Sequence, residues 1–197
     1  MNPQEKAAGM RHPDPGTVSP WVLRFAHLVP PGGTVLDLAA GGGRHSRFFL
    51  KRGHTVLAVD REIEALADIE DQRLSLMKAD LESGPWPFGE RRFSGIVVTN
   101  YLHRPLLAPL VAAVEDGGAF IYETFAEGNA AFGRPSNPAF LLRPGELLEA
   151  VGGALEVVAY EHGHVERPRP AVVQRIAAVR NPSSSLIRRI DPGAEGA

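Results

Sequence analysis

The chain contains the stretch Val35-Leu36-Asp37-Leu38-Ala39-Ala40-Gly41-Gly42-Gly43-Arg44-His45-Ser46, in which an apolar run leads into three glycines. A second apolar run, residues 55–60, ends in Asp60, seventeen residues after Gly43. A buried strand, a tight glycine turn, a helix and a second strand that ends in a carboxylate are typical of a mononucleotide-binding unit of an open α/β sheet. Glycines let the backbone approach a ligand, and a carboxylate on the neighbouring strand can accept both hydrogen bonds of a ribose diol. This spacing predicts a site for an adenosine across two strand ends.

The spacing of the glycines separates two kinds of adenosine site. A dinucleotide site has Gly-x-Gly-x-x-Gly, whereas this chain has Asp37-x-Ala39-x-Gly41-x-Gly43. The stretch resembles motif I of the class I S-adenosylmethionine (SAM) methyltransferases, an acid followed by Gly-x-Gly-x-Gly, and Asp60 matches the ribose-binding acid of that family. Ala39 stands where the first glycine of the family usually lies, and we expect its small side chain to be tolerated with a negative φ. The alternative, a turn that binds no ligand, would explain the glycines but not the placed acid.

Apolar runs alternate with helical patterns along the chain until the last two runs. We expect strands near residues 35–38, 55–60, 74–80, 95–100, 119–124, 155–160 and 171–179, and helices near residues 21–29, 44–52, 62–69, 104–115 and 144–151. Residues 82–92 are broken by prolines and predict a loop. Residues 161–170 are rich in turn formers, so the last two strands should be antiparallel neighbours. The resemblance covers roughly residues 20–180 and implies an α/β, doubly wound, Rossmann-like sheet of seven strands, mostly parallel with one antiparallel strand.

Length and composition favour a single domain at residues 20–180. The chain has 197 residues, of which 44% are hydrophobic, enough to bury a full core. Residues 1–19 and 181–197 lack periodicity, so we expect a disordered N-terminal arm and a flexible tail. The net charge of −2 disfavours nucleic acid as a partner. No apolar run approaches about eighteen residues and no secretory signal is evident, which predicts a cytoplasmic protein without membrane contact. The absence of cysteine excludes disulfides and thiolate catalysis, and nothing in the sequence predicts the oligomeric state.

Ligands of open α/β sheets bind at the carboxyl ends of the strands, which would gather several polar strand ends into one cleft. The family resemblance implies that Asp60 holds the ribose hydroxyls, that Asp80 faces the adenine, and that Asp37 reaches the amino end of the cofactor. Arg44 lies in a Gly-x-Gly-Arg-x-Ser pattern similar to that of small methyltransferases of the tellurite-resistance type, which implies a contact with the methionine carboxylate. The expected cofactor residues are Asp37, Ala39, Gly41, Gly43, Arg44, Asp60, Ala79, Asp80, Leu81 and Asn100.

Each of these assignments has a structural alternative. Asp80 would cap a turn after its strand, Asp37 would brace the glycine loop, and Arg44 would be a surface arginine beside a solvated helix N-terminus. The helix expected at residues 21–29 would cover the cofactor or close the core, and the two roles are compatible.

The segment that follows the fourth strand, residues 100–105, is the first candidate for the acceptor site, because members of the family meet cofactor and acceptor there. Methyl transfer from a sulfonium is an in-line displacement in which the enzyme contributes positioning and exclusion of water. We expect Tyr101 to orient the methyl group, His103 to remove a proton from the acceptor, and Arg104 to attract an anion. The alternative is a helix-capping loop with a histidine in solvent.

A long irregular segment after the fifth strand is the second candidate for the acceptor site, because long loops are often functional. Its candidate substrate residues are Glu123, Arg134 and Asn137. The alternative is a surface loop stiffened by proline. His162 and His164 also invite a metal site, but alternate polar residues of a hairpin usually face water, and no metal is expected.

Together these features predict a SAM-dependent methyltransferase that acts on a small, polar or anionic acceptor by in-line transfer, with S-adenosyl-L-methionine as its cofactor. A non-catalytic SAM-binding or interaction subunit is the alternative, because the chain lacks the Asn/Asp-Pro-Pro-Tyr signature of amino methylation. A hydrolytic or NAD-linked enzyme is disfavoured, since no nucleophile elbow and no dinucleotide glycine spacing are present. The acceptor atom cannot be read from the sequence, because this fold hosts many chemistries.

Overall fold

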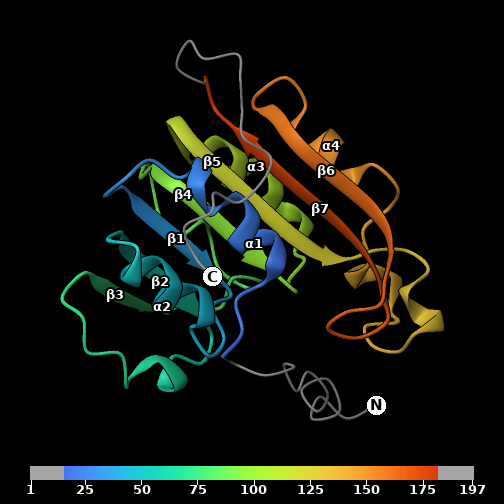
Figure 1. Cartoon of the computed structure of the whole chain (residues 1–197), viewed down its shortest axis with the longest axis horizontal. Coiled ribbons are helices and arrows are strands. Elements are labelled where there is room, and N and C mark those ends of the chain that lie inside the picture. Colours follow the sequence, from blue (N-terminus) through green and yellow to red (C-terminus); the bar gives the residue numbers. More distant parts are fainter. Residues whose placement is uncertain (1–15, 182–197) are drawn as a thin grey trace.

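A computed structural model describes residues 16–181 as one seven-stranded sheet with helices on both faces (Figure 1). The strands are β1 Thr34–Leu38, β2 Thr55–Asp60, β3 Leu74–Lys78, β4 Phe93–Thr99, β5 Val114–Phe125, β6 Glu156–Val165 and β7 Ala171–Val179. Their order across the sheet is β3-β2-β1-β4-β5-β7-β6. β7 is antiparallel to β5 and β6, and the other pairs are parallel. The predicted fold class is confirmed.

The order of the strands reverses between β1 and β4. From β1 the chain adds β2 and then β3 on one side, and it returns to place β4 on the other side of β1. In open α/β sheets a ligand binds at such a switch point, outside the carboxyl ends of the strands. The segments that follow β1, β2, β3 and β4 therefore border one site.

The helices are shorter than the sequence predicts. The α-helices are α1 Pro20–Phe25, α2 Arg44–Lys51, α3 Leu107–Ala112 and α4 Glu146–Val151, and the 3₁₀ helices are η2 Ala26–Leu28, η3 Glu64–Leu66, η4 Arg104–Leu106, η5 Asn129–Ala131 and η6 Pro138–Phe140. The helix expected at residues 62–69 is only the single turn η3, and the helix expected at residues 104–115 is divided into η4 and α3. The loop predicted at residues 82–92 is confirmed.

Two strands extend beyond their predicted limits. β5 begins at Val114, before the expected start at residue 119, because Val114 pairs with Phe93 at the start of β4. β6 continues to Val165, past the expected end at residue 160, because β7 pairs with it as far as the Val165–Ala171 pair. Backbone pairing with a long neighbour thus overrides the turn-rich composition of residues 161–165.

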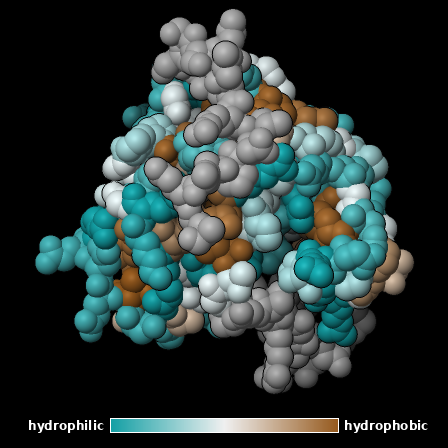
Figure 2. All heavy atoms as spheres, in the orientation of Figure 1, coloured by the Kyte–Doolittle hydropathy of each residue, from teal (hydrophilic) through white to brown (hydrophobic). Residues whose placement is uncertain are grey.

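A separate apolar layer covers each face of the sheet. Trp21 and Phe25 of α1 and Phe49 of α2 are fully buried against one face, whereas Leu110 of α3 and Leu147 of α4 are buried against the other. Figure 2 shows the side of the molecule that carries α1. Where it is coloured, the surface is largely hydrophilic, with apolar side chains in scattered patches rather than one continuous strip. The large apolar side chains that stay exposed come from different elements: Leu23, Leu76, Phe132, Phe140, Leu148 and Val157.

The start of α1 is attached to the sheet through Ser19. Its hydroxyl accepts hydrogen bonds from the backbone N–H groups of Trp21 and Val22 and donates one to Glu123 Oε1 at 2.8 Å. Its own N–H donates to Nε2 of His45 at 3.2 Å. The side chain is buried, so the folded part begins before the expected boundary at residue 20. The rest of the expected arm, residues 1–15, and the tail beyond residue 181 lie outside the described residues, and their predictions stay predictions.

Candidate active site

The loop that joins β1 to α2 turns sharply and leans on β2. Gly41 and Gly43 have φ angles of +53° and +75°. Gly43 is the N-cap of α2, and a Cβ atom there would lie 2.2 Å from Cδ2 of the buried Leu66, so only glycine fits without a shift. The N–H of Ala40 donates to the carbonyl of Val59 at 3.0 Å, which ties the loop to the neighbouring strand.

Ala39 departs from the conformation that we expected. Its φ is +54°, in the left-handed region that L-residues avoid at a cost of roughly 1–2 kcal/mol. The expectation of a negative φ is therefore wrong: the chain keeps the backbone path that a glycine would follow, although the residue is alanine. Asn100, just after β4, has φ +56°. Both residues line the same cleft, and backbone strain of this kind gathers at functional sites.

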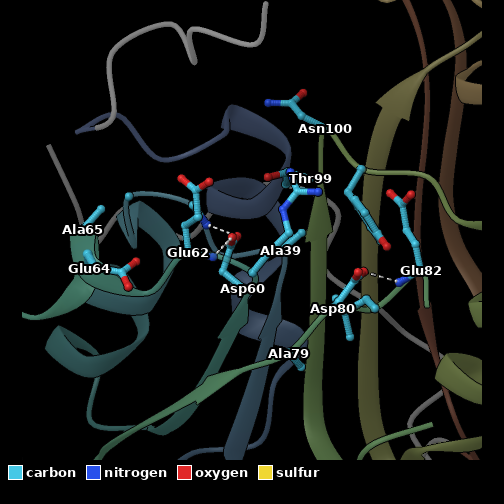
Figure 3. Close-up of a pocket in the computed structure, with 15 residues that line it drawn as sticks. Ala39, Asp60, Glu62, Glu64, Ala65, Ala79, Asp80, Glu82, Thr99 and Asn100 are labelled. Atoms are coloured by element: carbon cyan, nitrogen blue, oxygen red, sulfur yellow. Dashed lines mark hydrogen bonds between the residues drawn. The ribbon is translucent and has the colours of Figure 1, made fainter. Parts of the chain in front are cut away.

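A cleft of about 590 Å³ lies at the switch point between the strand ends (Figure 3). It is lined by Ala39, Gly41, Gly42, Asp60, Arg61, Glu62, Glu64, Ala65, Ala79, Asp80, Leu81, Glu82, Thr99, Asn100 and Tyr101. Seven of the ten expected cofactor residues are in this lining, and Asp37, Gly43 and Arg44 are not. The sequence analysis missed Arg61, Glu62 and Glu82, which lie one or two residues after Asp60 and Asp80. Reading one or two residues past Asp60 and Asp80 would have found them.

The carboxylate of Asp60 is fixed between two backbone N–H groups at the centre of the cleft (Figure 3). Oδ2 accepts a hydrogen bond from the N–H of Gly41 at 2.8 Å, and Oδ1 accepts one from the N–H of Glu62 at 3.0 Å. A carboxylate has about four acceptor positions, so both oxygens retain one for a ligand. Asp60 therefore presents two oriented acceptors, which is the arrangement that a pair of adjacent hydroxyl groups requires.

Asp80 caps the turn that follows β3 and also lines the cleft. Its carboxylate accepts hydrogen bonds from the N–H of Glu82 at 3.0 Å and from the hydroxyl of Ser83 at 2.8 Å. These bonds hold the pKa of Asp80 below its ordinary value, so the group is a carboxylate at neutral pH. The cap and the cleft position that the sequence analysis treated as alternatives are thus both present.

Asp37 and Arg44 bind the protein rather than line the cleft. Asp37 is almost fully buried and accepts a hydrogen bond from the Ser46 hydroxyl at 2.6 Å, which braces the start of α2 against β1. Arg44 donates to Thr99 Oγ1 and to the carbonyl of Thr17, both at 3.2 Å. Arg44 therefore joins α2 to the end of β4 and to the segment that precedes α1.

The residues that follow β4 have three different environments. Tyr101 lines the cleft, whereas the half-buried His103, directly before η4, does not. Arg104 binds both oxygens of Glu146, with Nε–Oε1 at 2.6 Å and Nη2–Oε2 at 3.0 Å. It also donates to two carbonyls of the segment that follows β5, those of Ala139 and Leu141. Arg104 thus clamps the start of η4 to α4 and to the segment that contains η6.

The three residues of the second candidate acceptor site, of which Glu123 lies within β5 and the other two on the segment after it, also lie outside the cleft lining. Glu123 is buried, accepts the Ser19 hydroxyl and pairs with Arg175 Nε at 2.6 Å. Asn137 caps η6 by accepting the N–H of Ala139 at 3.0 Å. Arg134 is exposed on the same segment. The structure therefore does not bring these three residues to the carboxylates of Asp60 and Asp80.

Two further findings concern only residues 16–181. No group of three or more His, Asp or Glu side chains there is arranged to hold a metal ion. His164 instead stacks on Phe132, with 4.5 Å between ring centroids, and lies 3.6 Å from Glu166. None of the helices in that range is long and apolar enough to cross a membrane.

Solved structures share this architecture. TehB from Haemophilus influenzae matches at 19% identity with a TM-score of 0.66, over 81% of this chain and 61% of that one, so the chain spans less than two thirds of that length. A second match is the Burkholderia thailandensis 1,6-didemethyltoxoflavin-N1-methyltransferase, with bound 1,6-didemethyltoxoflavin and S-adenosylhomocysteine. It has 26% identity and a TM-score of 0.57, over 81% of this chain and 75% of that one. A TehB-like SAM-dependent methyltransferase from Corynebacterium glutamicum matches at 19% identity with a TM-score of 0.57, over 84% of this chain and 90% of that one. The chain has the class I methyltransferase fold.

Among the comparisons, only the solved structures match, and they share the class I methyltransferase fold. No protein-family model matches the sequence, and no curated protein matches it. Within the class I methyltransferase fold, the cleft between the ends of β1, β2 and β4 is the switch-point crevice where ligands of open α/β sheets bind.

The buried Asp37 predicts a specific pH dependence of stability. Burial raises the pKa of Asp37 from 3.8 to about 6, so the folded chain holds this proton more tightly than the unfolded chain does. Between about pH 4 and pH 6 the contribution of Asp37 to the free energy of unfolding should therefore fall as pH rises, by about 2–3 kcal/mol. Burial lowers the pKa of His45 to about 3, which gives the opposite slope over much of the same window.

Asp37→Asn separates the two effects, because Asn still accepts the Ser46 hydroxyl and His45 is unchanged. Urea unfolding at pH 4 to pH 8 should show the variant gaining about 2–3 kcal/mol relative to the wild type as pH rises from 4 to 7. The exposed Asp116→Asn is the control and should show no such gain. Parallel stability profiles for Asp37→Asn and the wild type would contradict this assignment.

The clamp role of Arg104 predicts a loss of stability on substitution. In Arg104→Gln the carboxylate of Glu146, which is 5% exposed, loses its bidentate partner, while Arg104 itself is 35% exposed. Because the pair is only partly buried, we expect the free energy of unfolding to fall by about 1–3 kcal/mol. Chemical denaturation measures this change, with the exposed Arg92→Gln as a control that should change stability by less than about 0.5 kcal/mol. Equal stability of the two variants would contradict the proposed role of Arg104 in holding these elements together.

Proposed function

We propose that this chain is a methyltransferase that uses S-adenosyl-L-methionine to methylate a small, polar molecule. The observation that carries the proposal is the pair of oriented acceptors on Asp60, hydrogen-bonded to the glycine loop of β1 at 2.8 Å. The class I methyltransferase fold and a cleft at its switch point support it. The volume of about 590 Å³ lies in the range of clefts that bind cofactor-sized ligands.

The lining of the cleft fits this cofactor in charge as well as in shape. The lining contains five acidic residues, Asp60, Glu62, Glu64, Asp80 and Glu82, and one basic residue, Arg61. Glu64 is paired with Lys78 at 2.9 Å, so four carboxylates remain against one guanidinium. An excess of negative charge favours a cation over an anion, and SAM carries a sulfonium and an ammonium group. Asp60 would hold the ribose hydroxyls, and the turn of Asp80 with Leu81 would receive the adenine. The loop from Ala39 to Gly41 would lie against the remainder of the cofactor.

The cofactor supplies a methyl group on a positively charged sulfur, so the residues of the chain need only orient and enclose the reactants. Asn100 follows β4, at the edge of the cleft where family members meet the acceptor. His103 lies three residues further on and is the proposed proton acceptor for a neutral hydroxyl, thiol or amine. The guanidinium of Arg104 is held by Glu146, so it gives no support to an anionic acceptor.

The ribose role of Asp60 is tested by isothermal titration of SAM and S-adenosylhomocysteine. Asp60→Asn removes the negative charge that strengthens both ribose hydrogen bonds, so we expect binding to weaken about 10- to 100-fold. Asp68→Asn, an exposed partner of Arg47 outside the cleft, is the control and should bind like the wild type. Circular dichroism shows whether each variant is folded. Failure of the folded wild type to bind either compound at millimolar concentration would overturn the proposal.

Turnover is tested separately, by following the release of S-adenosylhomocysteine in a panel of small amines, thiols and hydroxyl compounds. With an accepted substrate, His103→Ala should lower kcat at least about 100-fold and leave the affinity for SAM unchanged, because a general base acts on the acceptor alone. Equal loss of kcat and of SAM affinity would contradict that role. Binding of SAM without turnover of any compound would instead identify a non-catalytic SAM-binding subunit.

A further inference from the structure

The cleft is bordered by two turns of the same design, one after β2 and one after β3. Each has the sequence Asp-x-Glu: the first is Asp60-Arg61-Glu62 and the second is Asp80-Leu81-Glu82. In both turns the N–H of the glutamate donates to Oδ1 of the aspartate at 3.0 Å, which fixes the backbone. Because β2 and β3 are adjacent and parallel, the turns lie at the same edge of the sheet, and all of their residues line the cleft.

The two turns differ in the charges that they bring to the cleft. At the middle position, Leu81 is buried, whereas Arg61 is exposed. The guanidinium of Arg61 and the carboxylate of Glu82 have no hydrogen bond or ion pair with another residue of the range 16–181. Glu82 and Arg61 therefore carry opposite charges that no contact within that range neutralises.

The effect of both charges reaches across the cleft to Tyr101, which follows β4 on the other side of β1. Burial is the main reason that the pKa of Tyr101 lies above its ordinary value. The carboxylate of Glu82 adds the next largest increase, whereas the guanidinium of Arg61 lowers the pKa. The two residues thus act on one cleft group in opposite directions.

The size of the cleft brings a bound ligand within range of these charges. A sphere of its volume, about 590 Å³, has a radius of about 5 Å, which is shorter than the screening length of about 10 Å at 0.1 M salt. A change of charge on any ligand atom in the cleft is therefore felt by the charged groups of the lining.

SAM and its product S-adenosylhomocysteine differ by one charge. Both carry an ammonium and a carboxylate group, but the sulfonium of SAM becomes an uncharged thioether after methyl transfer. We propose that Glu82 and Arg61 are specificity-determining residues that set the preference of the cleft between these two ligands: Glu82 favours the SAM cation, and Arg61 opposes it. The inference rests on the proposed function. Because carboxylates outnumber guanidiniums in the lining, the wild type binds SAM more tightly than the product, which favours product release.

The test is isothermal titration of SAM, S-adenosylhomocysteine and sinefungin, in which a protonated amine replaces the sulfonium, at a salt concentration of about 0.01 M. Glu82→Gln removes the charge and keeps the backbone N–H that binds Asp80. It should lower the ratio of the Kd of S-adenosylhomocysteine to the Kd of SAM about 2- to 5-fold, and Arg61→Gln should raise the ratio by a similar factor. Sinefungin should follow SAM in both variants.

Two control variants make the same changes of charge at the opposite edge of the sheet. Asp116→Asn, near the start of β5, and Arg92→Gln, directly before β4, should keep the wild-type ratio. Salt gives a second readout that needs no substitution. At about 1 M salt the screening length falls to about 3 Å, so the ratios of the wild type and all variants should converge.

Unchanged ratios for Glu82→Gln and Arg61→Gln at low salt would overturn the inference. A shift of both in the same direction would also overturn it, because that indicates a structural change. Sinefungin that follows S-adenosylhomocysteine would assign the preference to the methyl group, and equal shifts in the controls would assign it to the net charge. Failure of the folded wild type to bind any of the three ligands is a different result, because it removes the proposed function itself.

Discussion

The hydrogen bond from the N–H of Gly41 to the carboxylate of Asp60 joins the loop after β1 to the end of β2. The site depends on this bond, because it orients the acid and fixes the turn that begins α2. A carboxylate that only faced solvent would be free to rotate, whereas this one is held from both sides by backbone N–H groups of the loop and of its own strand end. Ala39, in the same loop, has a strained φ of +54°.

A row of polar side chains on the face that carries α1 and α2 supports that arrangement. Asp37 accepts from Ser46, Arg44 donates to Thr99, and Glu123 binds Ser19 and Arg175. These contacts tie α2 and the start of α1 to the strands β1, β4, β5 and β7. Charged residues near the site therefore form two groups. Asp37, Arg44 and Glu123 tie α1 and α2 to the sheet, whereas the carboxylates around Asp60 and Asp80 line the cleft.

How much the sequence predicted depends on the distance of each residue from its partners along the chain. The glycine loop and Asp60 could be identified because the motif is local, and the alternation of apolar runs with helical patterns predicted the seven strands and the antiparallel last pair. Arg104 and Glu123 were assigned to a substrate because their partners lie far away in sequence: Glu146 is 42 residues from Arg104, and Ser19 is 104 residues from Glu123. No local pattern indicates such a pairing. Tyr101 lines the cleft, but nothing in the local sequence indicates that its hydroxyl is buried, with less than 1 Å² exposed.

A crystal structure of the chain with S-adenosylhomocysteine tests the central claim most directly. The account predicts both ribose hydroxyls within about 3 Å of the two oxygens of Asp60, with the Gly41 hydrogen bond intact and the adenine beside the turn of Asp80. A ligand bound elsewhere, or a ribose held by other groups while Asp60 turns to solvent, would contradict it.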